Sequence, residues 1–235
     1  MPKKNDKDLL SLPIGGEGPI KSKVLGLART VLEHTLKFPQ LNKLYREVAE
    51  REDDRHFCER LLEELNVTIK VREGEIERIP EEGPVVVVAN HPFGAIEGAL
   101  LASLLLKRRP DVKILTNFLL GHVPDLDDLC IYVDPFGRKE SVASNARPLV
   151  DAIKWVRNGG LLAVFPSGEV SHLQVKKRKI IDPPWLQTVG RIIRKTDAIA
   201  LPIFFQGSNS CLFQVAWLVH KRLRTVMLSR EYIKK

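Results

Sequence analysis

The segment NHPFGAIEG at residues 90–98 places a histidine and an acid where they could share a proton-transfer step. His91 and Glu97 follow four consecutive valines, and proline and glycine lie between them. Such residues fix a turn between a strand and a helix. A carboxylate that accepts from one imidazole nitrogen sets the tautomer and stabilises the imidazolium, which leaves the other nitrogen free as a general base. A structural histidine and a helix N-terminal acid are the alternatives that the residues alone leave open.

Three further polar segments also come directly after predicted buried strands. They are DPFGRKE at residues 134–140, FPSGEVS at residues 165–171 and, more weakly, the stretch from 201 to 209. Ligands of open α/β sheets bind beyond the carboxyl ends of the strands. We therefore expect these segments to converge with His91 on one site.

The elements that must position these segments alternate between strands and helices. Predicted strands lie at residues 85–88, 112–115, 129–133, 161–165 and 199–204, with a hairpin at 67–71 and 75–79. Predicted helices lie at residues 21–36, 41–50, 54–65, 96–106, 142–157 and 186–195. This alternation predicts an α/β fold with a mostly parallel central sheet flanked by helices and an N-terminal helical extension. The expected division is a flexible arm at 1–20, N-terminal helices at 21–65 and an α/β domain at 66–235.

Composition limits the classes of partner. The 235-residue chain has a formal net charge of +8, which favours an anionic partner such as nucleic acid, a phospholipid surface or an acidic small substrate. No helix-turn-helix, zinc or RNP pattern is present, so we expect no nucleic acid. The three cysteines are far apart in the sequence, which argues against disulfides and a metal site and favours a reducing cytoplasm. We find no signal peptide and no apolar run of spanning length, so membrane contact is expected to be peripheral.

The polar segments together resemble the motif blocks of the glycerolipid acyltransferase superfamily, which includes the 1-acylglycerol-3-phosphate acyltransferases. The resemblance covers roughly residues 65–210 in the family's motif order. The family's N-H-x4-D block is H-x5-E here, and its F-P-E-G-T-R-S block is FPSGEVS at residues 165–171. These forms are similar to a bacterial subgroup described as hemolysin-like or related to ornithine-lipid O-acyltransferases.

This resemblance implies transfer of a fatty acyl group from a thioester, on acyl carrier protein or coenzyme A, to a hydroxyl of a lysophospholipid or related lysolipid. No other cofactor and no metal are implied. His91 would be the general base and Glu97 its orienting acid, with backbone amides near Gly94 or Gly168 as oxyanion donors. The expected substrate-binding residues are Asn90, Gly94, Arg138, Lys139, Pro166, Ser167, Gly168 and Glu169. Arg138, with Lys139, would meet an anionic headgroup, although a solvated charged turn is an equal alternative.

Two alternatives remain open within this resemblance: an O-acyltransferase that acts on a lyso-ornithine or other aminolipid, and a catalytically inactive lipid-binding member. The basic amphipathic helix at 21–36 and the cationic run at 176–179 could attract anionic headgroups or acidic acyl carrier protein. We expect a cytoplasmic protein that associates peripherally with the inner face of the membrane through weak, salt-sensitive contacts.

Overall fold

The computed structural model describes residues 10–11, 19–134, 139–219 and 221–233. Its centre is a five-stranded sheet in the order β3-β2-β4-β1-β7, in which all hydrogen-bonded neighbours are parallel. The strands are β1 Val85–Ala89, β2 Val112–Asn117, β3 Cys130–Val133, β4 Leu161–Val164 and β7 Ile199–Ile203. The predicted fold class is confirmed.

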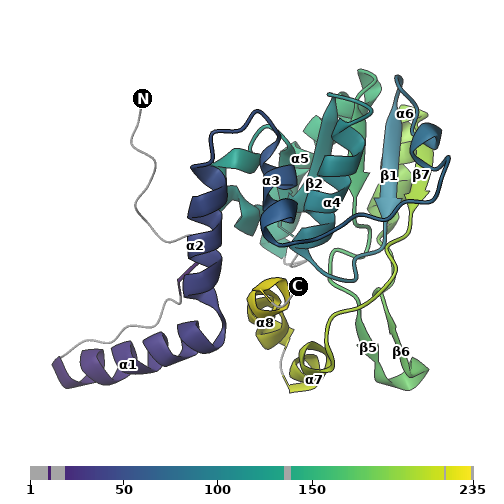
Figure 1. Cartoon of the computed structure of the whole chain (residues 1–235). Coiled ribbons are helices and arrows are strands. Elements are labelled where there is room, and N and C mark those ends of the chain that lie inside the picture. The colour runs from purple at the N-terminus through teal and green to yellow at the C-terminus, as the bar shows by residue number, and fades with distance from the viewer. Residues whose placement is uncertain (1–9, 12–18, 135–138, 220, 234–235) are drawn as a thin grey trace.

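Helices cover both faces of this sheet (Figure 1). The described helices are α1 Pro19–Thr35, α2 Phe38–Ala49, α3 Phe57–Glu64, α4 Ala95–Leu106, α5 Lys139–Arg157, α6 Gln187–Thr196, α7 Cys211–Val219 and α8 Lys221–Ile233. Apolar side chains of α2, α3 and α4 pack on one face, and those of α5 and α6 pack on the other. Within the described residues no helix combines the length and apolar character needed to cross a membrane.

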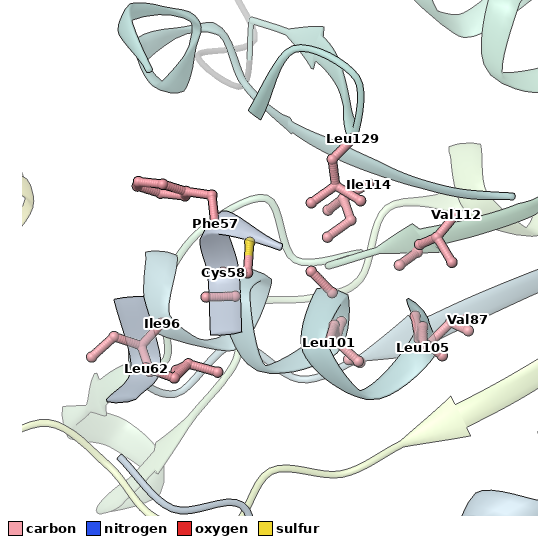
Figure 2. Packing of buried hydrophobic residues seen from close by; sticks show 14 of the residues in the cluster. Phe57, Cys58, Leu62, Val87, Ile96, Leu101, Leu105, Val112, Ile114 and Leu129 are labelled. Atoms are coloured by element: carbon pink, nitrogen blue, oxygen red, sulfur yellow. The ribbon is translucent and has the colours of Figure 1, made fainter. Parts of the chain in front are cut away.

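The larger core lies between α3, α4 and one face of the sheet. Figure 2 shows Leu101 and Leu105 of α4 beside Val87 of β1 and Val112 of β2. Alternate residues of β1 belong to the two cores, since Val85 and Val87 join this cluster and Val86 joins the other. The valine run is therefore buried on both faces, as a central parallel strand requires.

The predicted hairpin at residues 67–79 is wrong. This segment runs without strand pairing from the end of α3 to a 3₁₀ turn at Ile76–Arg78. Its apolar residues Val67, Ile69 and Ile76 instead pack against the core. Alternation of apolar and polar residues indicates only that one side of a segment is buried. In this segment, side chains of the core cover that side and no described strand pairs with it.

An antiparallel hairpin that the sequence did not predict lies later in the chain. It joins β5 His172–Gln174 to β6 Lys179–Ile181 through a 3₁₀ turn at Val175–Lys177. Helices α7 and α8 were not predicted either, and both follow the last strand of the sheet.

The N-terminal region extends away from the sheet. Helix α1 begins at Pro19, and its Leu27 and Val31 side chains are exposed (Figure 1). The predicted arm at 1–20 lies largely outside the described residues. Within it, the backbone of Leu10 forms two hydrogen bonds with the side-chain amide of Asn42, both of 2.9 Å.

Candidate functional site

His91 and Glu97 come together at the carboxyl end of β1. The distance between His91 Nδ1 and Glu97 Oε1 is 3.7 Å, and Glu97 has no exposed side-chain area while His91 retains 18%. The imidazole stacks on the ring of Phe165, which follows the neighbouring strand β4, with centroids 4.4 Å apart. With Nδ1 facing the acid, Nε2 is the ring nitrogen on the side away from Glu97.

Glu97 lies in the first turn of α4, where the helix dipole favours a negative charge. Its Oε1 also accepts a hydrogen bond from the backbone N–H of Phe93, in the turn that leads into the helix. A buried carboxylate requires such partners to remain charged. The helix-capping role and the histidine-orienting role are therefore compatible in one side chain.

Gly94 forms the turn between His91 and this helix. Its φ is 98°, a region that L side chains rarely adopt, and a Cβ at this position would lie 2.5 Å from the hydroxyl oxygen of Tyr232. That oxygen accepts from the N–H of Ala95 at 2.7 Å. Burial, together with the negative charge of Glu97, raises the pKa of Tyr232, so its hydroxyl stays neutral beside the helix start.

Asp182, at the base of the β5–β6 hairpin, holds the histidine loop from the other side. Its Oδ1 accepts from the backbone N–H of His91 at 3.2 Å and from the hydroxyl of Ser171, and its Oδ2 accepts from the indole of Trp185 at 3.0 Å. The N–H of Ser171 donates to the carbonyl of His91 at 2.7 Å. The hairpin base thus binds both backbone polar groups of His91.

Asn90 connects the same loop to the chain beyond β7. Its Nδ2 donates to the carbonyl of Phe205 at 2.8 Å, and its Oδ1 accepts from the N–H of Phe205 at 2.7 Å. Gly207 approaches the loop closely, since a Cβ there would meet the ring of Phe93 at 2.6 Å. Asn90, expected from the sequence to bind substrate, therefore braces the loop through the backbone of Phe205.

The loop after β4 forms a tight turn beside this site. Its carbonyl of Phe165 accepts from the N–H of Gly168, whose φ is 65°, and the hydroxyl of Ser167 donates to the carbonyl of Glu169 at 2.8 Å. Pro166 and Ser167 are buried, whereas Gly168 and Glu169 are exposed. Ser167 thus stabilises the turn that presents Glu169.

Comparisons with known proteins indicate the family of this chain. A family model described as "Acyltransferase" matches residues 18–229. The chain belongs to this acyltransferase family. It is also 29% identical over 158 residues to a lyso-glycine lipid O-acyltransferase of Phocaeicola vulgatus, an alignment that covers 67% of the chain and 53% of that relative. The chain therefore spans about half the length of the curated relative that it matches.

Within this acyltransferase chain, the sheet order explains which predicted site residues meet. Strands β4, β1 and β7 are neighbours, so the loops after them are brought together around His91. The loop after β3 emerges further along the same edge, because β2 and β4 separate β3 from β1. Arg138 lies outside the described residues, and Lys139 begins α5.

Asp182 and Tyr232 contact the histidine loop, and the sequence analysis missed both. Asp182 is followed by two prolines, which could have marked a fixed turn, but nothing in the sequence connects it to His91. Tyr232 lies 137 residues beyond its partner Ala95. Within the described residues, no group of three or more His, Cys, Asp or Glu side chains could hold a metal ion.

Proposed function

We propose that this protein is an O-acyltransferase that moves a fatty acyl group from an acyl thioester to a hydroxyl of a lysolipid. The observation that supports this best is the His91–Glu97 pair at the carboxyl edge of the sheet, 3.7 Å apart in a chain of the acyltransferase family. The donor would be a thioester of acyl carrier protein or coenzyme A. No bound cofactor takes part in this scheme.

In the proposed reaction, His91 Nε2 removes the proton from the acceptor hydroxyl as its oxygen attacks the thioester carbonyl. Glu97 stabilises the imidazolium that forms. The tetrahedral intermediate then collapses with loss of the thiolate, which takes the proton back from His91. Backbone N–H groups near Gly168 and Gly94 are the proposed donors to the oxyanion, since both glycines adopt positive φ in loops beside the imidazole.

The acceptor is proposed at the level of a lysolipid with a free hydroxyl. For a lysophospholipid acceptor, Arg138 or Lys139 is the proposed partner of the phosphate, and Glu169 is proposed to contact the headgroup. A lyso-aminolipid is the second candidate, which the name of the Phocaeicola vulgatus relative favours. A panel of lysophosphatidic acid, lyso-ornithine lipid and lyso-glycine lipid with one labelled thioester donor separates the two.

The mechanism is tested by comparing wild type with His91→Ala in this acyl-transfer assay. Loss of the general base is expected to lower kcat at least 100-fold. His122→Ala is the matched control, because His122 is exposed on the 3₁₀ turn that follows β2, and β4 lies between β2 and β1. Equal activity of His91→Ala and wild type, with every acceptor, would refute the proposed mechanism.

We also propose that the protein works as a peripheral protein at the cytoplasmic face of a membrane. A net charge of +8 favours an anionic surface, and an acceptor with a fatty chain resides in a bilayer.

A further inference from the structure

The tip of the β5–β6 hairpin carries four consecutive cations. Lys176, Lys177, Arg178 and Lys179 are all exposed, and the aliphatic side chains of Val175 and Ile180 on either side of them are exposed as well. Folding gains little from this arrangement, because apolar area is left in water and four like charges lie close together. An apolar surface rimmed by charge is typical of an interaction site.

Helix α7 presents an apolar face close to this tip. Its nine residues include no Asp, Glu, Lys or Arg, and Leu212, Val215 and Leu218 are 46%, 54% and 51% exposed. The residues between them, Phe213 and Gln214, are buried. A helix on the surface of a soluble domain ordinarily has a polar outer face. The apolar outer face of α7 therefore indicates contact with an apolar environment.

The hairpin and α7 are in contact. The side chain of Gln214 accepts a hydrogen bond from the backbone N–H of Leu173 in β5 at 2.8 Å. Figure 1 shows α7 and the tip of the hairpin at the same end of the molecule. We call residues 175–180 together with Leu212, Val215 and Leu218 the α7–hairpin surface.

This surface is attached directly to the candidate site. At the base of the hairpin, Ser171 and Asp182 bind the backbone of His91. Trp185 and Leu186, which follow β6, are 49% and 59% exposed, and a Cβ on Gly168 would contact Leu186. Exposed apolar side chains are therefore present both on the hairpin and beside the loop that follows β4.

We propose that the α7–hairpin surface docks the protein onto an anionic lipid bilayer. The cations at residues 176–179 contact the headgroups, and the aliphatic side chains of α7 enter the region between headgroups and acyl chains. Charge complementarity favours this occupant, because a second copy of the chain would bring the same four cations to the interface. The inference rests on the proposed function, since docking here brings the histidine loop to a lysolipid in the bilayer.

The test is flotation of the full chain with vesicles of phosphatidylcholine alone or with 30% phosphatidylglycerol, at low and at high salt. Wild type is expected to float with the anionic vesicles and to be released by about 1 M salt, where charges are screened within about 3 Å. Lys176→Gln/Lys177→Gln is expected to weaken this partitioning about 30-fold. Val215→Asp is expected to abolish it.

Each variant has a matched control on another part of the molecule. Lys154→Gln/Lys195→Gln removes the same charge near the ends of α5 and α6, at the amino edge of the sheet. Val150→Asp introduces the same acid at a valine that is 48% exposed, against 54% for Val215. Both controls are expected to float like wild type.

Three outcomes would overturn the proposal: wild type that does not float with either vesicle, hairpin variants that float no worse than their controls, or a Val215→Asp variant that changes from dimer to monomer by light scattering. Activity is measured in parallel with a short-chain lysolipid below its micellar concentration. A wild type that binds vesicles but does not acylate this lysolipid refutes the proposed function alone. A wild type that acylates it but does not bind vesicles refutes the docking surface alone.

Discussion

Glu97 is the most constrained side chain at the residue scale. It is fully buried, accepts from the N–H of Phe93 and faces His91 across 3.7 Å. The N–H of Phe93 and the facing imidazole favour a negatively charged carboxylate, whereas burial opposes it. The side chain at this position must therefore accept a hydrogen bond at the start of the helix and also carry a negative charge that faces the imidazole.

Glu97→Gln separates these two requirements. The amide oxygen can still accept from Phe93, so the fold should persist, but the negative charge that stabilises the imidazolium is lost. We expect kcat to fall about 100-fold or more with little change in KM. The measurements are steady-state kinetics, which should show the lower kcat, and thermal unfolding, which should give a near-native curve. An unchanged kcat would show that Glu97 only caps the helix.

The sequence was sufficient to pair His91 with Glu97, because both lie in one short strand–loop–helix segment. Glu97 stands one position beyond the acid of the usual family motif, and the positive φ of Gly94 belongs to the turn that brings it back to the histidine. Asp182 and Tyr232 could not be found in this way. Their contacts with the loop are tertiary, and neither residue stands in a motif.

At the scale of elements, α3 begins with an unusual cap. The Nδ1 atom of His56 accepts from the N–H of Cys58 at 3.2 Å, which only an unprotonated nitrogen can do. Burial lowers the pKa of His56 from 6.5, and among the smaller effects Glu59 and Asp125 raise it whereas Arg60 lowers it. The neutral ring is therefore the form that the folded protein prefers.

The stability of the protein should depend on pH through this cap. Below about pH 6.5 the unfolded chain binds a proton at His56 more readily than the folded chain, so the free energy of unfolding falls as pH is lowered through this range. His56→Asn keeps a capping acceptor that does not titrate, and should lose less stability than wild type between pH 7 and pH 5 in urea unfolding. His122→Asn, at an exposed position, is the control, and an equal pH response in His56→Asn and wild type would contradict this role.

The strand–helix alternation predicted the five sheet strands and the helices between them, because buried parallel strands are continuous apolar runs with clear ends. The same reasoning failed for the β5–β6 hairpin. Its strands have three residues each and its tip is lysine-rich, so the segment looked like a charged loop. Helix α8 was hidden in the same way, since Lys221, Arg222 and Arg224 obscured its apolar residues.

At the scale of the whole molecule, Arg109 joins segments that are distant in sequence. It is 1% exposed, pairs with Asp111 through two hydrogen bonds of 2.8 and 2.6 Å, and donates to the carbonyls of Pro80, Gly83 and Gly159. The guanidinium thus connects the approach to β1, the end of α4 and the turn before β4.

Arg109→Met should leave those carbonyls without their donor in the interior. We expect a loss of about 3 kcal/mol in the free energy of unfolding, or about 6–12 °C in Tm for a chain of this size. Arg147→Met is the control, since the side chain of Arg147 is 93% exposed. Calorimetry that finds equal Tm values for the two variants would show that Arg109 contributes nothing to stability.

The bracing of the histidine loop has a consequence for the protein during its synthesis. Residues 90–97 contain the proposed base and its acid, but they are held by Asp182, Phe205 and Tyr232. When the ribosome has synthesised only the first half of the sheet, the chain already contains His91 and Glu97. It still lacks the three residues that hold the loop. The nascent chain is therefore expected to acquire a competent site only when residue 232 has emerged, so that truncated translation products would compete poorly for the thioester pool.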